Sequence, residues 1–447
     1  MGDDYDSVLV RNELACVLNE AQRNALSHKM GMTSLLQLYN NNDPDTFEAE
    51  LIDMMNRILV AGTKGPHIDR LIKFISQVLA RIHQQIAKQT EDEQELDFLS
   101  SQASRKNRTL NVTTSILDYL LETSQAGNKA VRWRSCQFIG ITLNHITAEI
   151  DEKIWEELKQ NLLVRTQDKI PQIRVAAIVA LRRLQDPTDK KDRVVKEFIR
   201  ILSNDVQKEV RKAVIQSLVV SVHTIPIFIE RTKDVAPEVR KEVYRVLGNA
   251  KKSLFETEQL VSIFGNGLAD RDPKVVKNCQ KIIAKFASTM PLLAFIASLV
   301  PQQNQKLIEQ IIRFLVSDRK FDFSTIERTD EYAVEYNILH RIFLSKVLHD
   351  GNDEYDDYLP EIFDICRQIL LMYQEEEMFD LKQLLQIGQT LDYSNEAGRR
   401  KMSTILREIL REVKQLDLHP LLVSLLRKIH PDESDFIQML LEILADI

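Results

Sequence analysis

The sequence contains few of the residues that interrupt regular structure, with only 12 Gly and 12 Pro among 447 residues. This scarcity leaves little room for the frequent turns of a β-sandwich, so helices are favoured. No stretch reaches the ~20 uninterrupted apolar residues that a membrane-spanning helix needs. The amino terminus is acidic and has no apolar run. We therefore expect no secretory signal or transit peptide, and a soluble intracellular protein without a membrane partner.

Residue patterns typical of catalysis or metal binding are also lacking. The four cysteines are far apart, and none has a Cys or His at metal-ligand spacing, so all four are interpreted as small core residues. No phosphate-binding loop, His-Glu-x-x-His helix or Gly-x-Ser-x-Gly elbow occurs. We therefore expect no catalysis, no metal, no cofactor and no small-molecule substrate.

The chain does contain a repeat. Its copies begin with an Asp, have Pro or Lys three residues later, and continue with Val or Ile and, in most copies, Arg; they start at Asp168, Asp205, Asp234 and Asp270. A fifth, degenerate copy at residues 127–132 lacks the Asp but keeps Val131 and Arg132. Successive positions of the repeat Arg, or of its equivalent, are separated by 42, 37, 29 and 36 residues. These intervals are typical of paired-helix solenoids.

The repeat has the composition of a helix start. An Asp caps exposed backbone amides, a Pro suits the first turn, and apolar residues then recur at spacings of three and four. In the copy that begins at Asp168, the apolar stripe runs from Ile173 to Leu184, while Arg182 and Arg183 point elsewhere. One such helix cannot bury its stripe alone. The sequence therefore predicts an all-α, curved solenoid of helix pairs with nearest-neighbour contacts.

The repeat resembles the HEAT repeat, and several longer runs resemble one HEAT family. The runs that carry this second resemblance are residues 131–138, 168–187, 231–235, 239–240, 396–401 and 406–410. Their order and spacing, over about residues 50–410, are similar to those of condensin complex subunit 3, also named chromosome-associated protein G, a HEAT-repeat non-SMC subunit of condensin. Members of that family are about twice as long, so we interpret the chain as an amino-terminal half or a shortened homologue.

The resemblance implies a function in binding, with ATP hydrolysis left to other subunits. It implies that the chain grips the kleisin subunit of condensin and, through it, the paired SMC ATPase subunits. Together they would hold double-stranded DNA without sequence specificity in mitotic chromosome condensation. The resemblance also implies a location in the nucleus and on chromosomes, with cytoplasm as a further location outside mitosis.

Charge is distributed unevenly over the three segments that we predict. These are residues 1–110, with amino-terminal helical repeats; 111–317, a basic repeat core; and 318–447, carboxyl-terminal repeats with an acidic loop near 350–357. Residues 126–285 contain 30 Lys and Arg against 20 Asp and Glu, a balance of +10, whereas the other residues contain 29 against 46, a balance of −17. A basic surface along one side of a solenoid engages phosphates through counterion release. The alternative is that these charges only solvate outer helix faces.

We predict two roles for the charged residues of the repeats. Cross-repeat pairing, in which a repeat Arg reaches the Asp of a neighbouring repeat, is predicted for Asp168, Arg174, Asp205, Arg211, Asp234, Arg240 and Asp270. Contact with the DNA backbone is predicted for Lys129, Arg132, Arg134, Lys169, Lys208, Lys212, Lys233 and Lys241, and toward the amino terminus for Arg70, Lys73, Lys106 and Arg108. Trp133, beside this row, is interpreted as a core or helix-contact residue.

The main alternative function is that of a protein scaffold, of the phosphatase-scaffold or transport-adaptor type, whose concave face holds an extended peptide. DNA affinity that falls steeply with rising salt distinguishes the two functions, because peptide grooves depend more on apolar burial. A HEAT-like base-excision glycosylase also uses a basic concave face. Such an enzyme needs an aromatic-lined pocket with a carboxylate, and the chain has only two Trp.

Overall fold

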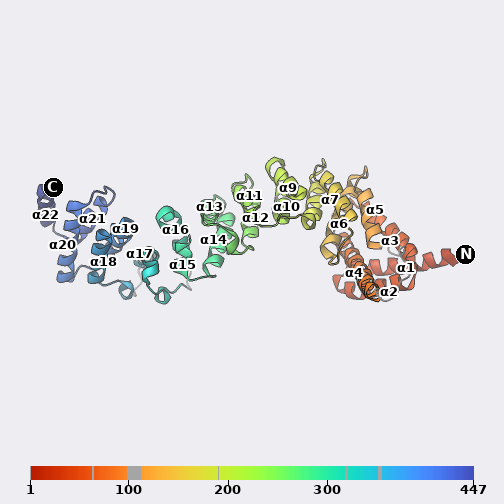
Figure 1. Cartoon of the computed structure of the whole chain (residues 1–447), viewed down its shortest axis with the longest axis horizontal. Helices are drawn as coiled ribbons and strands as arrows, with labels where there is room; N and C mark the ends of the chain where they lie inside the picture. Colours follow the sequence, from red (N-terminus) through yellow and green to blue (C-terminus); the bar gives the residue numbers. More distant parts are fainter. Residues whose placement is uncertain are drawn as a thin grey trace. The chain divides into compact units, whose positions relative to one another are not determined.

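The described residues are helical throughout and form two compact units. The computed structural model describes residues 2–62, 65–97, 112–189, 191–317, 321–350 and 355–446, and their regular structure contains helices but no strand (Figure 1). The units are Met1–Ala250 and Lys251–Ile447. No helix in the described part of the chain is both long enough and apolar enough to cross a bilayer. The predicted all-α HEAT-type fold is confirmed.

The first unit is built of helix pairs. Its α-helices are α1 Gly2–Arg23, α2 His28–Asn41, α3 Pro44–Leu59, α4 Pro66–Asp97, α5 Val112–Thr123, α6 Lys129–His145, α7 Glu152–Arg165, α8 Pro171–Leu181, α9 Arg193–Asn204, α10 Lys208–Ser217, α11 Ile225–Arg231 and α12 Pro237–Leu247. From α5 onward they form the pairs α5/α6, α7/α8, α9/α10 and α11/α12. The second helices contact one another extensively, whereas the first helices are farther apart. This unequal packing curves the row of pairs toward the second helices.

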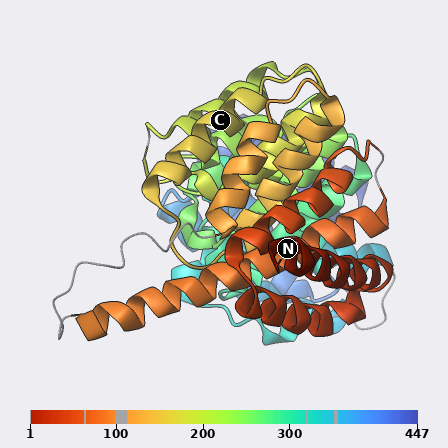
Figure 2. The ribbon, with the colours of Figure 1, turned by 90° about the vertical axis from the view of Figure 1, so that its right-hand side faces the viewer.

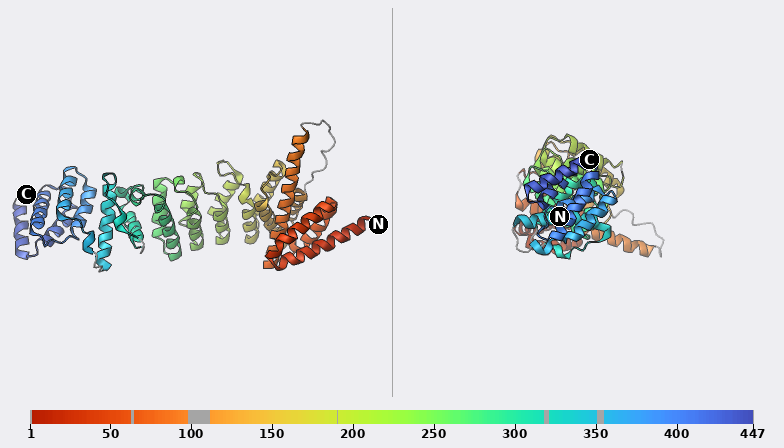
Figure 3. Two further views of the ribbon diagram at one scale, coloured as in Figure 1. Left: turned by 90° about the horizontal axis from the view of Figure 1, so that it is seen from below. Right: turned by 90° about the vertical axis from the view of Figure 1, so that its left-hand side faces the viewer.

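Helix α4 is much longer than its neighbours. Its carboxyl-terminal part extends beyond the helices that contact its first half (Figures 2 and 3). The sequence predicts a solvated loop or helix end over residues 89–107. The helix continues to Asp97, so the acidic run at residues 91–95 is helical, and residues 98–111 lie outside the described part.

Two second helices approach each other closely at Gly140 of α6. A Cβ atom on Gly140 would lie 3.1 Å from the Cα atom of Ala180 in α8, so the backbones meet with no side chain between them. Ala180 and its neighbours Ala176 and Ala177 are themselves buried and small. Small residues on both helices therefore set the close spacing between the repeats.

We expect Gly140→Val to destabilise this helix pair by ~1–3 kcal/mol, because overpacking forces the α8 backbone to move. Hydrogen exchange should report the loss in α6 and α8 before more distant repeats, since contacts in a solenoid are local. Gly265→Val in α13 (Thr257–Leu268) is the matched control, because nothing lies within 4 Å of a Cβ atom at that helical glycine. Equal losses in the two variants would contradict the packing role of Gly140.

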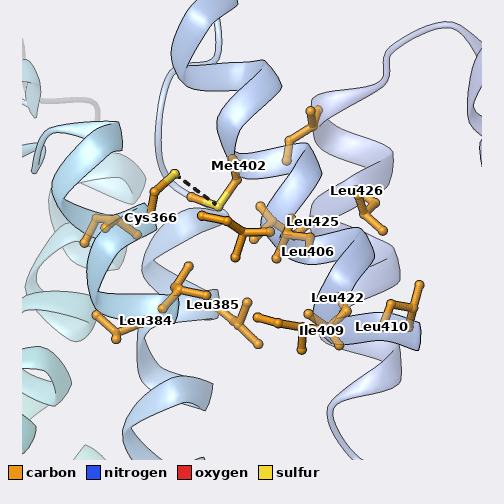
Figure 4. Packing of buried hydrophobic residues seen from close by; sticks show 14 of the residues in the cluster. Cys366, Leu384, Leu385, Met402, Leu406, Ile409, Leu410, Leu422, Leu425 and Leu426 are labelled. Atoms are coloured by element: carbon orange, nitrogen blue, oxygen red, sulfur yellow. Dashed lines mark hydrogen bonds between the residues drawn. The ribbon is translucent and has the colours of Figure 1, made fainter. Parts of the chain in front are cut away.

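The second unit has a continuous core toward its carboxyl end. Its α-helices are α13, α14 Pro273–Ala287, α15 Leu292–Ala297, α16 Pro301–Val316, α17 Ala333–Asp350, α18 Ile362–Gln374, α19 Met378–Gly388, α20 Glu396–Glu412, α21 His419–Ile429 and α22 Glu433–Asp446. Leucines of α19, α20 and α21 meet in this core, with Leu385, Leu406 and Leu422 among them (Figure 4). In the same core the Cys366 sulfur lies 3.9 Å from that of Met402.

Three of the four cysteines are buried. Burial raises the pKa of the thiols of Cys136 and Cys279 to about 12, and that of Cys366 to about 11. These thiols therefore stay protonated and unreactive near neutral pH. Cys16 is exposed on α1, so the interpretation of all four as core residues is wrong for this one.

The division between the units does not follow charge. It lies at Ala250 and Lys251, inside the segment 111–317 that the sequence predicts as one basic core. That segment was defined by its charge, which does not determine how helices pack. The predicted boundaries at 110/111 and 317/318 fall at stretches outside the described residues. Of the acidic stretch 350–357, residues 351–354 are also outside, and Tyr355–Tyr358 form a short 3₁₀ helix.

Candidate nucleic-acid interface

The repeat Asp shapes the turn that precedes each second helix. Its Oδ1 atom accepts a hydrogen bond from the backbone amide two residues later; the four bonds are to Ile170 at 2.9 Å, Gln207 at 2.9 Å, Ala236 at 2.9 Å and Asp272 at 2.8 Å. The sequence assigns the Asp to the helix cap, but the capping residues of α8, α10 and α12 are Ile170, Gln207 and Ala236. The Asp therefore fixes an Asx turn just before the helix.

Three of the repeat arginines reach the Asp of the following repeat. The Nε atom of each donates to Oδ2; the three pairs are Arg132–Asp168 at 2.8 Å, Arg174–Asp205 at 2.7 Å and Arg211–Asp234 at 2.8 Å. In each pair Nη2 also donates to Oδ1, so the contact is bidentate. Such geometry is specific to the planar guanidinium group. We name these six residues the Arg–Asp ladder.

The ladder also fixes the turns from within. The Nη1 atom of Arg174 donates to the carbonyl of Asp168, and that of Arg211 donates to the carbonyl of Asp205, at 3.0 and 2.8 Å. Arg240 donates in the same way to the carbonyl of Asp234 at 2.8 Å. Each of these arginines binds a backbone carbonyl of its own turn. Arg174 and Arg211 also bind the Asp side chain of the next repeat. The ladder therefore sets the register between successive repeats.

The charges of the ladder stabilise one another. Burial raises the pKa of Asp168, but hydrogen bonds from Arg132 and from the Ile170 amide lower it by more. The pKa of Asp168 is therefore below its usual range. The hydrogen bond to Asp234 raises the pKa of Arg211. Asp168 and Arg211 therefore stay ionised around neutral pH.

Two arginines predicted to contact DNA are occupied elsewhere. The guanidinium of Arg132 belongs to the ladder, and its Nη1 atom donates to the carbonyls of Ala126 and Gly127. The side chain of Arg134 is 0% exposed, so the prediction for it is wrong. Arg134 follows Arg132 by two positions on α6, and two positions along a helix rotate a side chain by about 200°. Arg134 is thereby turned away from the exposed edge.

Arg134 is instead held inside the amino-terminal repeats. It donates to the carbonyl of Ala61 at 3.2 Å, to Asp69 at 3.2 Å and to Gln137 at 2.7 Å. Its guanidinium also lies 4.1 Å from the ring centroid of Trp133. Burial lowers the pKa of Arg134, which Asp69 partly restores. Trp133 is buried, as expected for a helix-contact residue.

The lysines of the predicted row remain at the surface. Lys129, Lys169 and Lys233 are exposed near the starts of α6, α8 and α12, and within the described residues they form no ion pair. We name these three the edge lysines. Lys208, the first residue of α10, is also exposed, but its Nζ atom lies 2.6 Å from Glu238, whose hydrogen bond raises the pKa of the lysine. Lys241 is exposed on α12.

The predicted extension toward the amino terminus is only partly exposed. The Nε atom of Arg70 donates to the carbonyl of Gln22 at 2.8 Å, so its guanidinium joins α4 to α1. Lys73 is exposed on α4. Lys106 and Arg108 lie outside the described residues. The edge lysines are therefore the best-defined part of the predicted DNA surface.

Sequence reasoning missed a groove of about 660 Å³ across the second helices α6, α8 and α10. Its apolar lining includes Trp133, Ile141, Val175 and Val179, and Lys212 lies at its rim. The signal in the sequence was Val179, an apolar residue on the face of α8 that points away from the core. The predicted contact of Lys212 with DNA thus belongs to a different surface from the edge lysines. Among the described residues, no group of His, Cys, Asp and Glu is arranged to hold a metal ion.

Comparisons with known proteins confirm the resemblance to condensin complex subunit 3. The human protein of that name is 27% identical over 461 residues, which cover 93% of this chain and 44% of the relative. The Schizosaccharomyces pombe protein is 27% identical over 450 residues, covering 96% of this chain and 49% of the relative. The chain therefore spans about half the length of the curated relatives it matches. No family model matches it.

A solved structure gives the same result for the fold. The crystal structure of the S. pombe condensin Cnd3–Cnd2 subcomplex matches with a TM-score of 0.80 and 27% identity. The match covers 96% of this chain and 56% of that chain. The likeness thus extends over both units.

Proposed function

We propose that this chain is a non-catalytic HEAT-repeat subunit of a condensin complex, which binds a kleisin segment and the backbone of duplex DNA. The observation that carries the proposal is the match over nearly the whole chain to the Cnd3–Cnd2 subcomplex, in which Cnd2 is a kleisin. Through the kleisin the chain joins the paired SMC ATPases, on chromosomes in the nucleus during mitotic condensation. It contributes binding surfaces, and the ATPases supply the energy.

The edge lysines support the DNA part of the proposal. Lys129, Lys169 and Lys233 are exposed near the starts of the second helices of three repeats. The neighbouring arginines are paired with Asp side chains in the Arg–Asp ladder, which holds the turns of the repeats in fixed register. Exposed ammonium groups suit phosphates and carry no information about bases, so we expect binding to be independent of DNA sequence.

The groove across α6, α8 and α10 supports the kleisin part. It combines an apolar strip with polar residues such as Gln172 and Glu209, it is open to solvent, and it crosses three successive second helices. An extended chain fits such a groove better than a double helix does, because apolar side chains gain little from phosphates. A scaffold for some other extended peptide would use the same groove. The identity of the bound chain therefore distinguishes the two functions.

Purification of the tagged chain from its own cells tests the proposal. We expect mass spectrometry to find a kleisin homologue and a pair of SMC proteins with it. Val179→Asp places a carboxylate in the groove, and should weaken kleisin binding at least ~10-fold, or about 1.4 kcal/mol. The matched control is Val222→Asp, at an exposed valine that does not line the groove. Recovery of another extended partner in place of a kleisin would favour the scaffold function.

A further inference from the structure

Helix α14, labelled in Figure 1, belongs to the second unit. Four of its lysines form a stripe along the helix. The helix buries its other side, where the Cys279 sulfur lies 3.8 Å from the carbonyl of Phe264 in α13 and the Phe286 ring packs on that of Phe264. The opposite side is exposed and carries lysines at spacings of three and four; they are Lys274, Lys277, Lys281 and Lys285. We name these four the α14 stripe.

The positive charge of the stripe is not balanced within the helix. The 15 residues of α14 include no Asp or Glu, and in the described part of the chain Lys274, Lys277 and Lys281 form no ion pair. By contrast, the exposed Arg200 in α9 has the Glu197 carboxylate one turn away. Lysines four residues apart repel and destabilise a helix. The stripe therefore reduces the stability of α14.

The second unit that contains the basic α14 stripe has a net negative charge. Residues 251–447, which form the second unit, contain 24 Lys and Arg against 32 Asp and Glu, a balance of −8. A helix with four lysines and no acid reverses the sign of its unit locally. A general need for solubility does not require such a stripe, because the unit is already strongly charged.

The spacing of the stripe suits a phosphate backbone. Eleven residues separate its ends, a distance of ~16 Å at 1.5 Å per residue. One DNA strand carries a phosphate every ~3.4 Å along the helix axis, so the stripe is long enough to face more than one phosphate of a duplex. Its exposed side offers no large apolar side chain, which an extended acidic peptide would need to gain affinity. Charge and spacing thus favour duplex DNA over a peptide.

We propose that the α14 stripe is a second phosphate-binding surface for duplex DNA, in addition to the edge lysines of the first unit. This inference rests on the proposed function, that the chain binds duplex DNA. When a phosphate approaches, each ammonium group replaces a counterion condensed on the DNA. The phosphates also neutralise the lysines and remove their mutual repulsion, so DNA should order α14.

The test replaces three members of the stripe, in the full chain, by Gln: Lys274→Gln, Lys277→Gln and Lys281→Gln. Gln favours helices about as well as Lys, and the change removes repulsion, so the variant should fold at least as well as the wild type. Fluorescence anisotropy with a labelled duplex of about three helical turns, repeated over a range of salt, gives the affinity and its salt dependence. We expect the slope of log affinity against log salt to flatten by ~2.7, about 0.9 for each contact.

Two comparisons make the outcome decisive. A control with the same loss of charge on exposed residues of the same unit is Arg367→Gln, Lys401→Gln and Lys414→Gln, which should keep the wild-type slope. Hydrogen exchange of the wild type should show α14 protected by the duplex. If the stripe variant keeps the wild-type slope of log affinity against log salt, and replacement of the edge lysines flattens that slope, this inference is overturned. The proposed function then still stands.

Two further outcomes also overturn it. A wild-type chain that binds no duplex removes both the inference and the DNA part of the proposed function. A stripe variant that loses binding to polyglutamate but keeps wild-type affinity for the duplex shows that α14 binds acidic peptides.

Discussion

Replacing Lys129, Lys169 and Lys233 together by Glu is expected to weaken binding to duplex DNA roughly 100-fold near physiological salt. Each phosphate contact contributes about 0.9 to the slope of log affinity against log salt, so the loss of three should flatten the slope by ~2.7. The factor should be similar for duplexes of unrelated sequence, because backbone contacts carry no base information. Anisotropy titrations with two unrelated duplexes over a range of salt measure both quantities.

The control for this variant must change the net charge equally at other exposed positions. Lys153→Glu, Lys191→Glu and Lys196→Glu serve this purpose, because all three lysines are exposed in the first unit and lie outside the turns before the second helices. Kleisin binding should persist in both variants, since the apolar groove is unchanged. An edge variant that stays folded and keeps wild-type affinity and slope would show that the edge lysines only solvate the surface. The scaffold function would then replace DNA holding for this part of the chain.

The repeat fold was predictable because the same short pattern recurs. An Asp, a Pro or Lys three residues later and the following Val or Ile mark a turn and a helix start, and the spacing of copies identifies paired helices. The pattern does not determine which residue caps the helix. Asp168 lies two positions before the capping residue Ile170 and shapes an Asx turn. Asp272, two residues after a repeat Asp, caps α14 directly through the Lys274 amide.

The candidate site was predictable only where position in the repeat decides exposure. Turn residues such as Lys129 and Lys169 must lie at the surface, and they do. The prediction for Arg134 was wrong because this side chain binds Asp69 and Ala61, which precede it by 65 and 73 positions. No local sequence pattern reveals that these residues lie close to it. The groove was missed for the same reason, since it exists only where three helices meet. The α14 stripe was visible as a run of lysines, but that Lys274, Lys277 and Lys281 form no ion pair within the described residues required the packed structure.

Breaking the Arg–Asp ladder at Arg211 is expected to cost about 3 kcal/mol. The Asp234 side chain is 2% exposed, so Arg211→Met leaves a buried carboxylate without its bidentate partner, which typically costs about 3–5 kcal/mol. A value at the lower end is expected because Arg231 lies 3.9 Å from the same carboxylate. Stability in a solenoid is a sum of local and neighbouring contributions. Hydrogen exchange should therefore show the loss in α10 and α12, with a smaller effect on DNA affinity.

A second ion pair joins the same two helices and provides the control. Lys208 in α10 pairs with Glu238 in α12, but both side chains are about half exposed, so Lys208→Met should change stability little. Combining Arg211→Met with Asp234→Asn removes both buried charges and keeps the oxygen that accepts from the Ala236 amide. The double variant should therefore recover part of the loss. If Arg211→Met and Lys208→Met had equal effects, the buried ladder would stabilise the repeats no more than a surface pair, and the register between α10 and α12 would have to come from apolar packing alone.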